Sequence, residues 1–80
     1  MSELYKRYVD VVTFVSKEGA TTPLFLVWDG EKYPIEKVTA VENRASVVGG
    51  CGIRYTCKIH GQIRHLFLER DRFFIESYHP

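Results

Sequence analysis

The sequence predicts an all-β protein, a single small antiparallel meander of about six short strands that forms an SH3-like barrel or a curled roll. Three observations lead to this fold class. Apolar and polar residues alternate with the two-residue period of a half-buried strand, most clearly over residues 53–60. Turn pairs such as Asp29-Gly30 and His60-Gly61 separate the apolar segments. No segment has the 3.6-residue apolar stripe of an amphipathic helix.

The first half of the chain is expected to form three strands. Their segments share β-branched, aromatic or bulky apolar side chains, and they cover residues 8–16, 24–28 and 33–41. Asp29-Gly30 predicts a tight hairpin between the second and third segments, because both residue types accept positive φ. Pro23 and Pro34 fall at or near strand starts, where a missing N–H is tolerated.

The second half is expected to form three more strands. Glycines at 49, 50 and 52 predict a turn before the first of them. A two-residue turn at His60-Gly61 then sets the register and makes one face core, with Ile59 opposite Gln62, Cys57 opposite Arg64, Tyr55 opposite Leu66, and Ile53 opposite Leu68. A four-residue loop over 69–72 extends this layer, with Phe73 beside Leu68 and Ile75 beside Leu66.

The opposite face of these strands is the candidate binding surface. Aromatic rings lie among its cations, so it is too apolar for a purely solvated face. The N-terminal strands, through Val9, Val11, Phe14 and Val15, are one candidate cover, and a partner molecule is the other. For a partner, the expected binding residues are Arg54, Lys58, His65, Phe67, Arg72, Phe74 and Tyr78.

Length, composition and charge indicate one small folded domain and do not identify an activity. The 80 residues are enough for one domain, 1–80, with residues 1–4 and 79–80 expected to be frayed. Net charge is only +1, although residues 1–43 are acidic overall and residues 44–80 are basic. We expect a non-enzymatic protein-interaction module, with an unidentified protein or a second copy as partner and self-association through the aromatic and basic face as one mode.

Single-stranded nucleic acid is the alternative partner. Small barrels hold single strands by stacking bases on rings and neutralising phosphates, here with Arg54, Lys58, Phe67 and Phe74. No RNP-type motif is present, and the sequence pI of about 7.8 lies below the range typical of nucleic-acid-binding domains. Protein binding therefore leads.

Metal and catalytic sites are not expected. The thiols and imidazoles of Cys51, Cys57, His60 and His65 are the ligand types that zinc prefers. Their spacing matches no standard zinc motif, and strand alternation directs Cys57 to the core and His65 to the other face. No nucleophile, phosphate-loop or metalloprotease motif is present, so no cofactor is expected either.

The sequence also favours a cytoplasmic location. Residues 1–8 contain no apolar segment of the kind found in secretory signals. Apolar runs such as Leu24–Trp28 are far shorter than the roughly 20 residues that cross a bilayer, so no membrane partner is expected. In a reducing compartment a Cys51–Cys57 disulfide is not expected.

Three groups of residues resemble a family of small uncharacterised bacterial proteins, a domain of unknown function. They are Pro23-Leu24 with Trp28-Asp29-Gly30, then Gly50-x-Gly52-x-Arg54-Tyr55-Thr56-Cys57-x-Ile59, then Leu68-Glu69 with Arg72-Phe73-Phe74-Ile75-Glu76. The resemblance spans about Thr13 to Glu76, and the family pattern would place Trp where this chain has Phe73. It implies a bacterial source but no activity, cofactor or catalytic residue.

Overall fold

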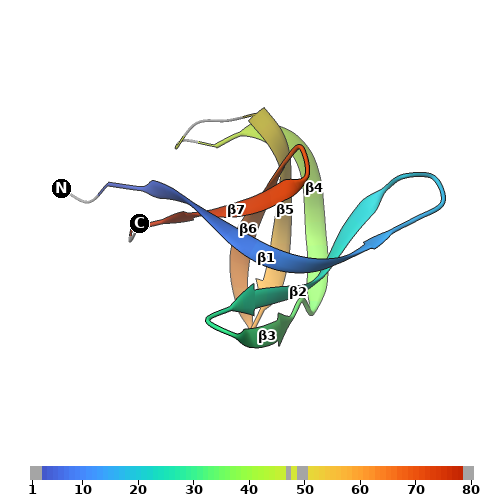
Figure 1. Cartoon of the computed structure of the whole chain (residues 1–80), viewed down its shortest axis with the longest axis horizontal. Coiled ribbons are helices and arrows are strands. Elements are labelled where there is room, and N and C mark those ends of the chain that lie inside the picture. Colours follow the sequence, from blue (N-terminus) through green and yellow to red (C-terminus); the bar gives the residue numbers. More distant parts are fainter. Residues whose placement is uncertain (1–2, 47, 49–50, 79–80) are drawn as a thin grey trace.

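The protein is an all-β chain folded as one curled antiparallel sheet, as predicted (Figure 1). The computed structural model describes residues 3–46, 48 and 51–78. The strands are β1 (Tyr5–Val15), β2 (Thr21–Trp28), β3 (Glu31–Pro34), β4 (Lys37–Ala45), β5 (Cys51–Ile59), β6 (Gln62–Glu69) and β7 (Arg72–Ser77). Their order in the sheet is β3-β2-β1-β7-β6-β5-β4.

The described residues form seven strands instead of about six, because residues 33–41 are not one strand. The chain leaves β3 after Pro34, which has no N–H to continue a ladder. The Ile35 N–H donates to the Leu24 carbonyl at 2.9 Å, whereas the Glu36 N–H donates to the Lys58 carbonyl at 2.8 Å. Two neighbouring residues therefore bond to opposite halves of the sheet, and β4 starts beside β5.

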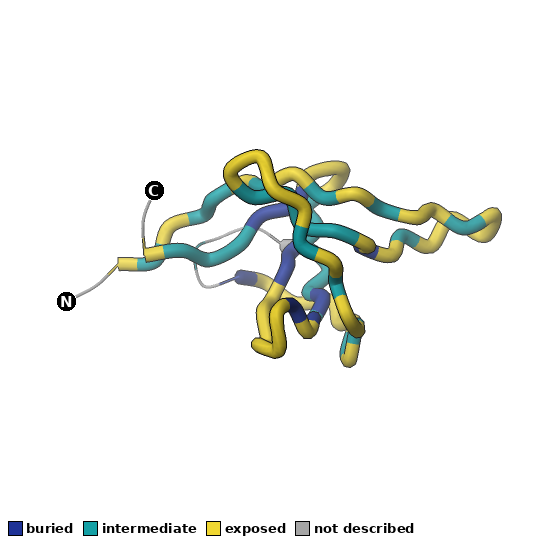
Figure 2. Tube along the Cα trace, turned by 90° about the horizontal axis from the view of Figure 1, so that it is seen from below, coloured by how far each residue is buried: buried dark blue, intermediate teal, exposed yellow. Residues whose placement is uncertain are grey.

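The sheet is an open roll. The first strand pairs with the last, from Tyr5↔Ser77 to Val9↔Phe73. Nevertheless, no ladder joins β3 to β4 within the described residues, so these two strands are the edges of the sheet. The β1–β2 hairpin extends away from the body as an arm whose residues are mostly exposed (Figure 2).

The predicted register of β5 and β6 is confirmed from Ile53↔Leu68 to Ile59↔Gln62. His60 and Gly61 have φ angles of 52° and 71°, as a tight two-residue turn requires. The predicted core face is confirmed by the buried cluster of Tyr55, Cys57, Ile59, Leu66 and Phe73. Strands β1 and β2 cover this cluster with partly buried apolar side chains that include Val9, Val11 and Leu26.

The hairpin between β6 and β7 differs from the prediction in two ways. Glu69 pairs with Arg72, so the turn contains only Arg70 and Asp71 and not four residues. Phe73 does pair with Leu68 as predicted, but the ladder ends one pair later, at Phe67↔Phe74. No ladder pairs Ile75 with Leu66, because β7 turns away from β6 to follow β1 (Figure 1). Ile75 nevertheless packs against the core cluster and extends the apolar layer, as predicted.

Some expectations fall on parts of the chain outside the described residues. The turn at Gly49-Gly50 and the frayed ends at residues 1–2 and 79–80 lie there. Glu3 and Leu4 are described and precede β1. Gly52 is described too, and it belongs to β5 instead of the turn.

Candidate docking groove

The predicted aromatic face is packed within the molecule. Phe67 and Phe74 stack with their ring centroids 5.1 Å apart, and their residues are only 3% and 1% exposed. Tyr8 of β1 meets the Phe74 ring edge-on at 6.0 Å, and the Lys6 Nζ lies 4.7 Å from the centre of the same ring. Of the two covers considered for this face, the N-terminal strand supplies one, through Lys6 and Tyr8 of β1, whereas Phe14 and Val15 are exposed. The two rings are therefore not available as exposed binding residues.

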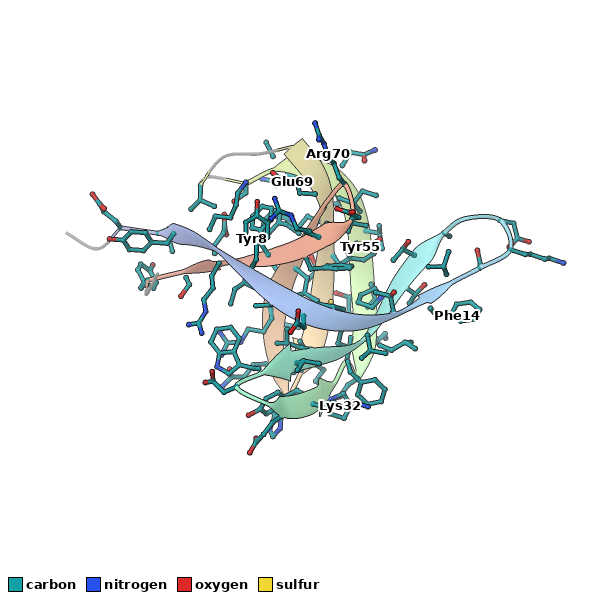
Figure 3. All side chains as sticks on the ribbon, in the orientation of Figure 1. Tyr8, Phe14, Lys32, Tyr55, Glu69 and Arg70 are labelled. Carbon is teal, nitrogen blue, oxygen red and sulfur yellow. The ribbon has the colours of Figure 1, made fainter. Side chains whose placement is uncertain are left out.

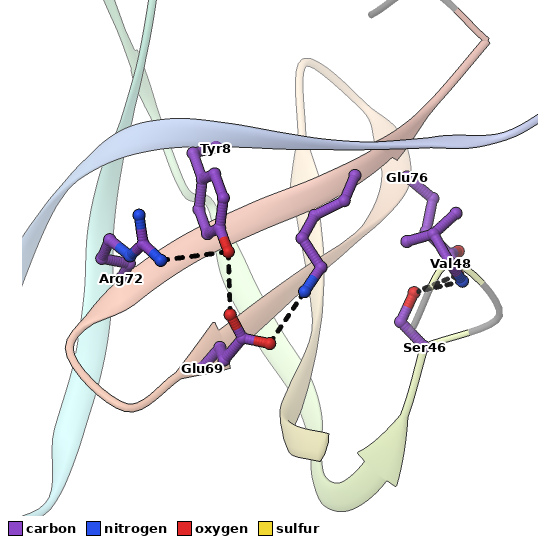
Figure 4. Close-up of polar contacts among 7 residues, drawn as sticks. Tyr8, Ser46, Val48, Glu69, Arg72 and Glu76 are labelled. Carbon is purple, nitrogen blue, oxygen red and sulfur yellow. Dashed lines mark hydrogen bonds and ion pairs between the residues drawn. The ribbon is translucent and has the colours of Figure 1, made fainter. Parts of the chain in front are cut away.

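A polar cluster fixes this cover in place (Figure 4). The Glu69 carboxylate accepts hydrogen bonds from Lys6 Nζ at 2.8 Å and from the Tyr8 hydroxyl at 2.9 Å. Arg72 donates to the Tyr8 hydroxyl at 3.2 Å, and its guanidinium carbon lies 4.0 Å from the centre of the Tyr8 ring. Tyr8 and Glu69 are labelled in Figure 3. Arg72, a predicted binding residue, thus contacts β1.

The Glu69 cluster predicts an acid-sensitive stability. The hydrogen bonds from Lys6 and then Tyr8 lower the pKa of Glu69 below its usual value of about 4.3. A lowered folded-state pKa contributes stability that is present above the unfolded value and is lost as pH falls through the folded value. We expect the urea concentration at the unfolding midpoint of the wild type to decrease as the pH is lowered from about 5 to about 3. This decrease should be smaller in Glu69→Gln.

Glu18→Gln is the control for this measurement, because Glu18 is an exposed residue of the β1–β2 turn. Its acid-induced fall in the urea midpoint should match that of the wild type. Equal acid sensitivity in Glu69→Gln and wild type would contradict the role assigned to the cluster. Glu42, whose pKa is also lowered by a hydrogen bond, here from Arg54, accounts for part of the remaining dependence.

Arg54 and Lys58, the predicted basic residues of β5, have different surroundings. Arg54 donates to the Glu42 carboxylate at 2.8 Å, and its buried Nε has no hydrogen-bond partner among the described residues. Lys58 is exposed and lies directly opposite Lys37 in the β4–β5 ladder. The sheet therefore does not bring the predicted binding residues together into one exposed site.

A concave site lies instead where β6 and β7 separate. It has a volume of about 650 Å³ and is open to solvent. Apolar residues of β2, β3, β5, β6 and β7 line its interior: Leu26, Tyr33, Ile59, Leu66 and Ile75. Trp28, Ile63 and two of the predicted residues, His65 and Tyr78, also line it. We call this site the β6–β7 groove.

The free side of β6 forms one wall of this groove. Ile59 and Gln62 flank a two-residue turn, and such residues exchange hydrogen bonds with each other. Bonding direction alternates along a strand, so Ile63 and His65 direct their N–H and C=O groups away from β5. The β6–β7 ladder ends at Phe67, so it does not reach Ile63 or His65, and these two residues are exposed. This stretch of β6 therefore has the properties of a sheet edge.

Arg64 was not among the predicted site residues, although its position carried a signal. It lies opposite Cys57, on the core face of β6, where the two positions that follow, Leu66 and Leu68, are apolar. Its side chain is exposed in the groove and donates to Gln62 Oε1 at 2.7 Å, and within the described residues it forms no ion pair. A cation on an apolar concave wall is suited to bind a carboxylate.

Three of the residues considered as metal ligands, Cys57, His60 and His65, lie in different parts of the sheet. Cys57 is a free, fully buried thiol, and burial raises its pKa to about 11. His60 is exposed at the turn and His65 on the other face, where its Nδ1 is 3.3 Å from Thr56 Oγ1. Across the described part of the chain, no group of three His, Cys, Asp or Glu side chains could hold a metal. The Cys51 side chain is outside that part.

Comparison with models of protein families, with curated proteins and with solved structures gives no match. The resemblance to a bacterial family stays a prediction. Among the described residues, no helix is long and apolar enough to span a membrane.

Proposed function

We propose that the protein is a non-enzymatic protein-interaction module that binds an extended segment of a partner in the β6–β7 groove. The observation that carries this proposal is the end of the β6–β7 ladder at Phe67↔Phe74, beside a concavity of about 650 Å³. An exposed strand edge next to apolar pockets is the arrangement by which many domains add a peptide strand to a sheet.

The bound segment would lie along residues 62–66 of β6. Its backbone would bond to Ile63 and His65, and a stretch of this length is about 16 Å when extended. Alternate side chains of the segment would enter the groove toward Leu26 and Trp28. The guanidinium carbon of Arg7 lies 4.1 Å from the centre of the Trp28 ring. A carboxylate on the segment would pair with Arg64.

Burial of the rings favours this proposal over nucleic-acid binding. Stacking on single strands requires ring faces that are open to bases. Phe67 and Phe74 are buried, and Arg54 is held by Glu42. Of the four residues assigned to that function, only Lys58 is both exposed and without an ion pair in the described chain.

The groove can be tested with selected peptides. A phage-displayed library of short random peptides is panned on the protein, and enriched sequences are synthesised with a fluorophore for anisotropy titrations. We expect Ile63→Glu to weaken binding at least about tenfold, because it places a charge on the apolar rim. Val15→Glu is the matched control, because Val15 on the β1–β2 arm is 60% exposed and Ile63 is 57% exposed.

N-methylation of the peptide tests the strand-pairing mode. Only every second amide of an added strand bonds to its neighbour, so methylation should abolish binding at alternate positions. Equal sensitivity at all positions would contradict strand addition, and equal loss in Ile63→Glu and Val15→Glu would contradict the groove. Failure to enrich any peptide would contradict the proposed function as a whole.

A further inference from the structure

The two edges of the sheet are protected to different extents. Strand β3 is four residues long and ends in Pro34, so it offers little for another strand to pair with. Strand β4 is nine residues long, and its first part carries an irregularity between Val38 and Ala40. Its last five residues, 41–45, are regular and all exposed. This segment is an open sheet edge.

The register of β5 shows which groups of this edge are free. Tyr55 and Ile53 belong to the hydrogen-bonded pairs with β6, so Arg54 and Gly52 direct their backbone groups toward β4. Their partners there are Glu42 and Arg44. The residues between and beside these partners, Val41, Asn43 and Ala45, therefore direct their N–H and C=O groups outward.

The charges along this edge favour pairing with a second copy of the same chain. If two β4 strands pair antiparallel about Asn43, Val41 lies opposite Ala45 of the second copy, and Glu42 lies opposite its Arg44. Centring the pairing on Glu42 or on Arg44 instead places like charges face to face. Centring it on Val41 brings the irregularity at Val38 and Ala40 into the ladder.

We propose that two copies of this chain associate through Val41–Ala45 of β4 in the register centred on Asn43. Glu42 and Arg44 have side chains that are 44% and 58% exposed, so both are available across the edge. Within one copy Arg44 Nη1 lies 4.0 Å from Glu42 Oε2, whereas Arg54 Nη2 lies 2.8 Å from Glu42 Oε1. The pairing forms two Glu42–Arg44 contacts, one on each side of the two-fold axis, and buries both Val41 side chains.

Sedimentation velocity over about 10 µM to about 1 mM protein tests the association. We expect a dimer whose fraction rises with concentration, because a five-residue edge gives a small interface. Arg44→Glu and Glu42→Arg should each raise the dimer dissociation constant at least about tenfold, since each places like charges opposite one another twice. An equimolar mixture of the two variants should restore the dimer as a heterodimer.

Three outcomes would overturn the proposal. They are a monomer throughout the concentration range, a dimer that neither charge variant weakens, and a mixture of the variants that does not associate. Glu42→Arg also removes the contact with Arg54, which could affect folding. Circular dichroism is therefore used to check that each variant is folded. The peptide titrations at Ile63 do not involve this edge, so failure of one proposal leaves the other standing.

Discussion

Replacement of Phe74 by alanine is expected to unfold most of the protein at room temperature. Phe74 is 1% exposed and contacts the rings of Phe67 and Tyr8. Truncation of a buried Phe typically costs about 3–5 kcal/mol, which includes the cavity that remains. A domain of this size has a stability of about 3–5 kcal/mol from its core. The loss therefore equals the whole free energy of unfolding.

Far-ultraviolet circular dichroism with urea titration measures this effect, and Phe14→Ala is its matched control. Phe14 lies on the extended β1–β2 arm (Figure 3) and is 57% exposed, so its truncation should change the free energy of unfolding by less than about 0.5 kcal/mol. A folded Phe74→Ala variant with the wild-type urea midpoint would contradict the packing of Phe74 between Phe67 and β1. It would also restore the interpretation of Phe74 as an exposed binding residue.

The β5–β6 hairpin was predictable because its determinants are local. Strand alternation and the His60-Gly61 turn together permit one register that buries the apolar residues, and the structure has that register. The division of residues 33–41 into two strands was harder to predict from the sequence. It depends on which distant carbonyl groups accept hydrogen bonds from the N–H groups of Ile35 and Glu36. The fold class thus follows from local pattern, but the path between the two halves of the sheet does not.

The candidate site was less predictable than the fold. Lys6 and Tyr8 cover Phe74 from β1, more than sixty positions away from their partner Glu69. Alternation within β6 and β7 left the cover of their outer face open, and it did not show that Tyr8 of β1 pairs with Phe74. Nor does it show that the two strands separate after Phe74, since the same sequence could continue the ladder. Gln62 and Arg64, polar residues on the core face, were local signs of an opening there.

Gly52→Ala is expected to destabilise the protein by about 3 kcal/mol, at the upper end of the range for overpacking. The triplet of glycines predicted a turn, yet Gly52 lies within β5 and needs the absence of a side chain for another reason. A Cβ at this position would collide with the backbone carbonyl of Leu68. Leu68 is part of the β5–β6 and β6–β7 ladders, so its carbonyl can move only if two neighbouring strands shift.

Gly61→Ala is the control for Gly52→Ala. It measures the loss of stability from replacing a glycine where the new Cβ has no close contact. Gly61 has a φ of 71°, and a Cβ added there would have no neighbouring atom within 4 Å, so only conformational strain of about 1 kcal/mol is expected. Amide hydrogen exchange should show lost protection at Ile53 and Leu68 in Gly52→Ala, and changes confined to the turn in Gly61→Ala. If both variants lose the same stability and Leu68 stays protected, the backbone approach at Gly52 does not limit the packing of β5 on β6.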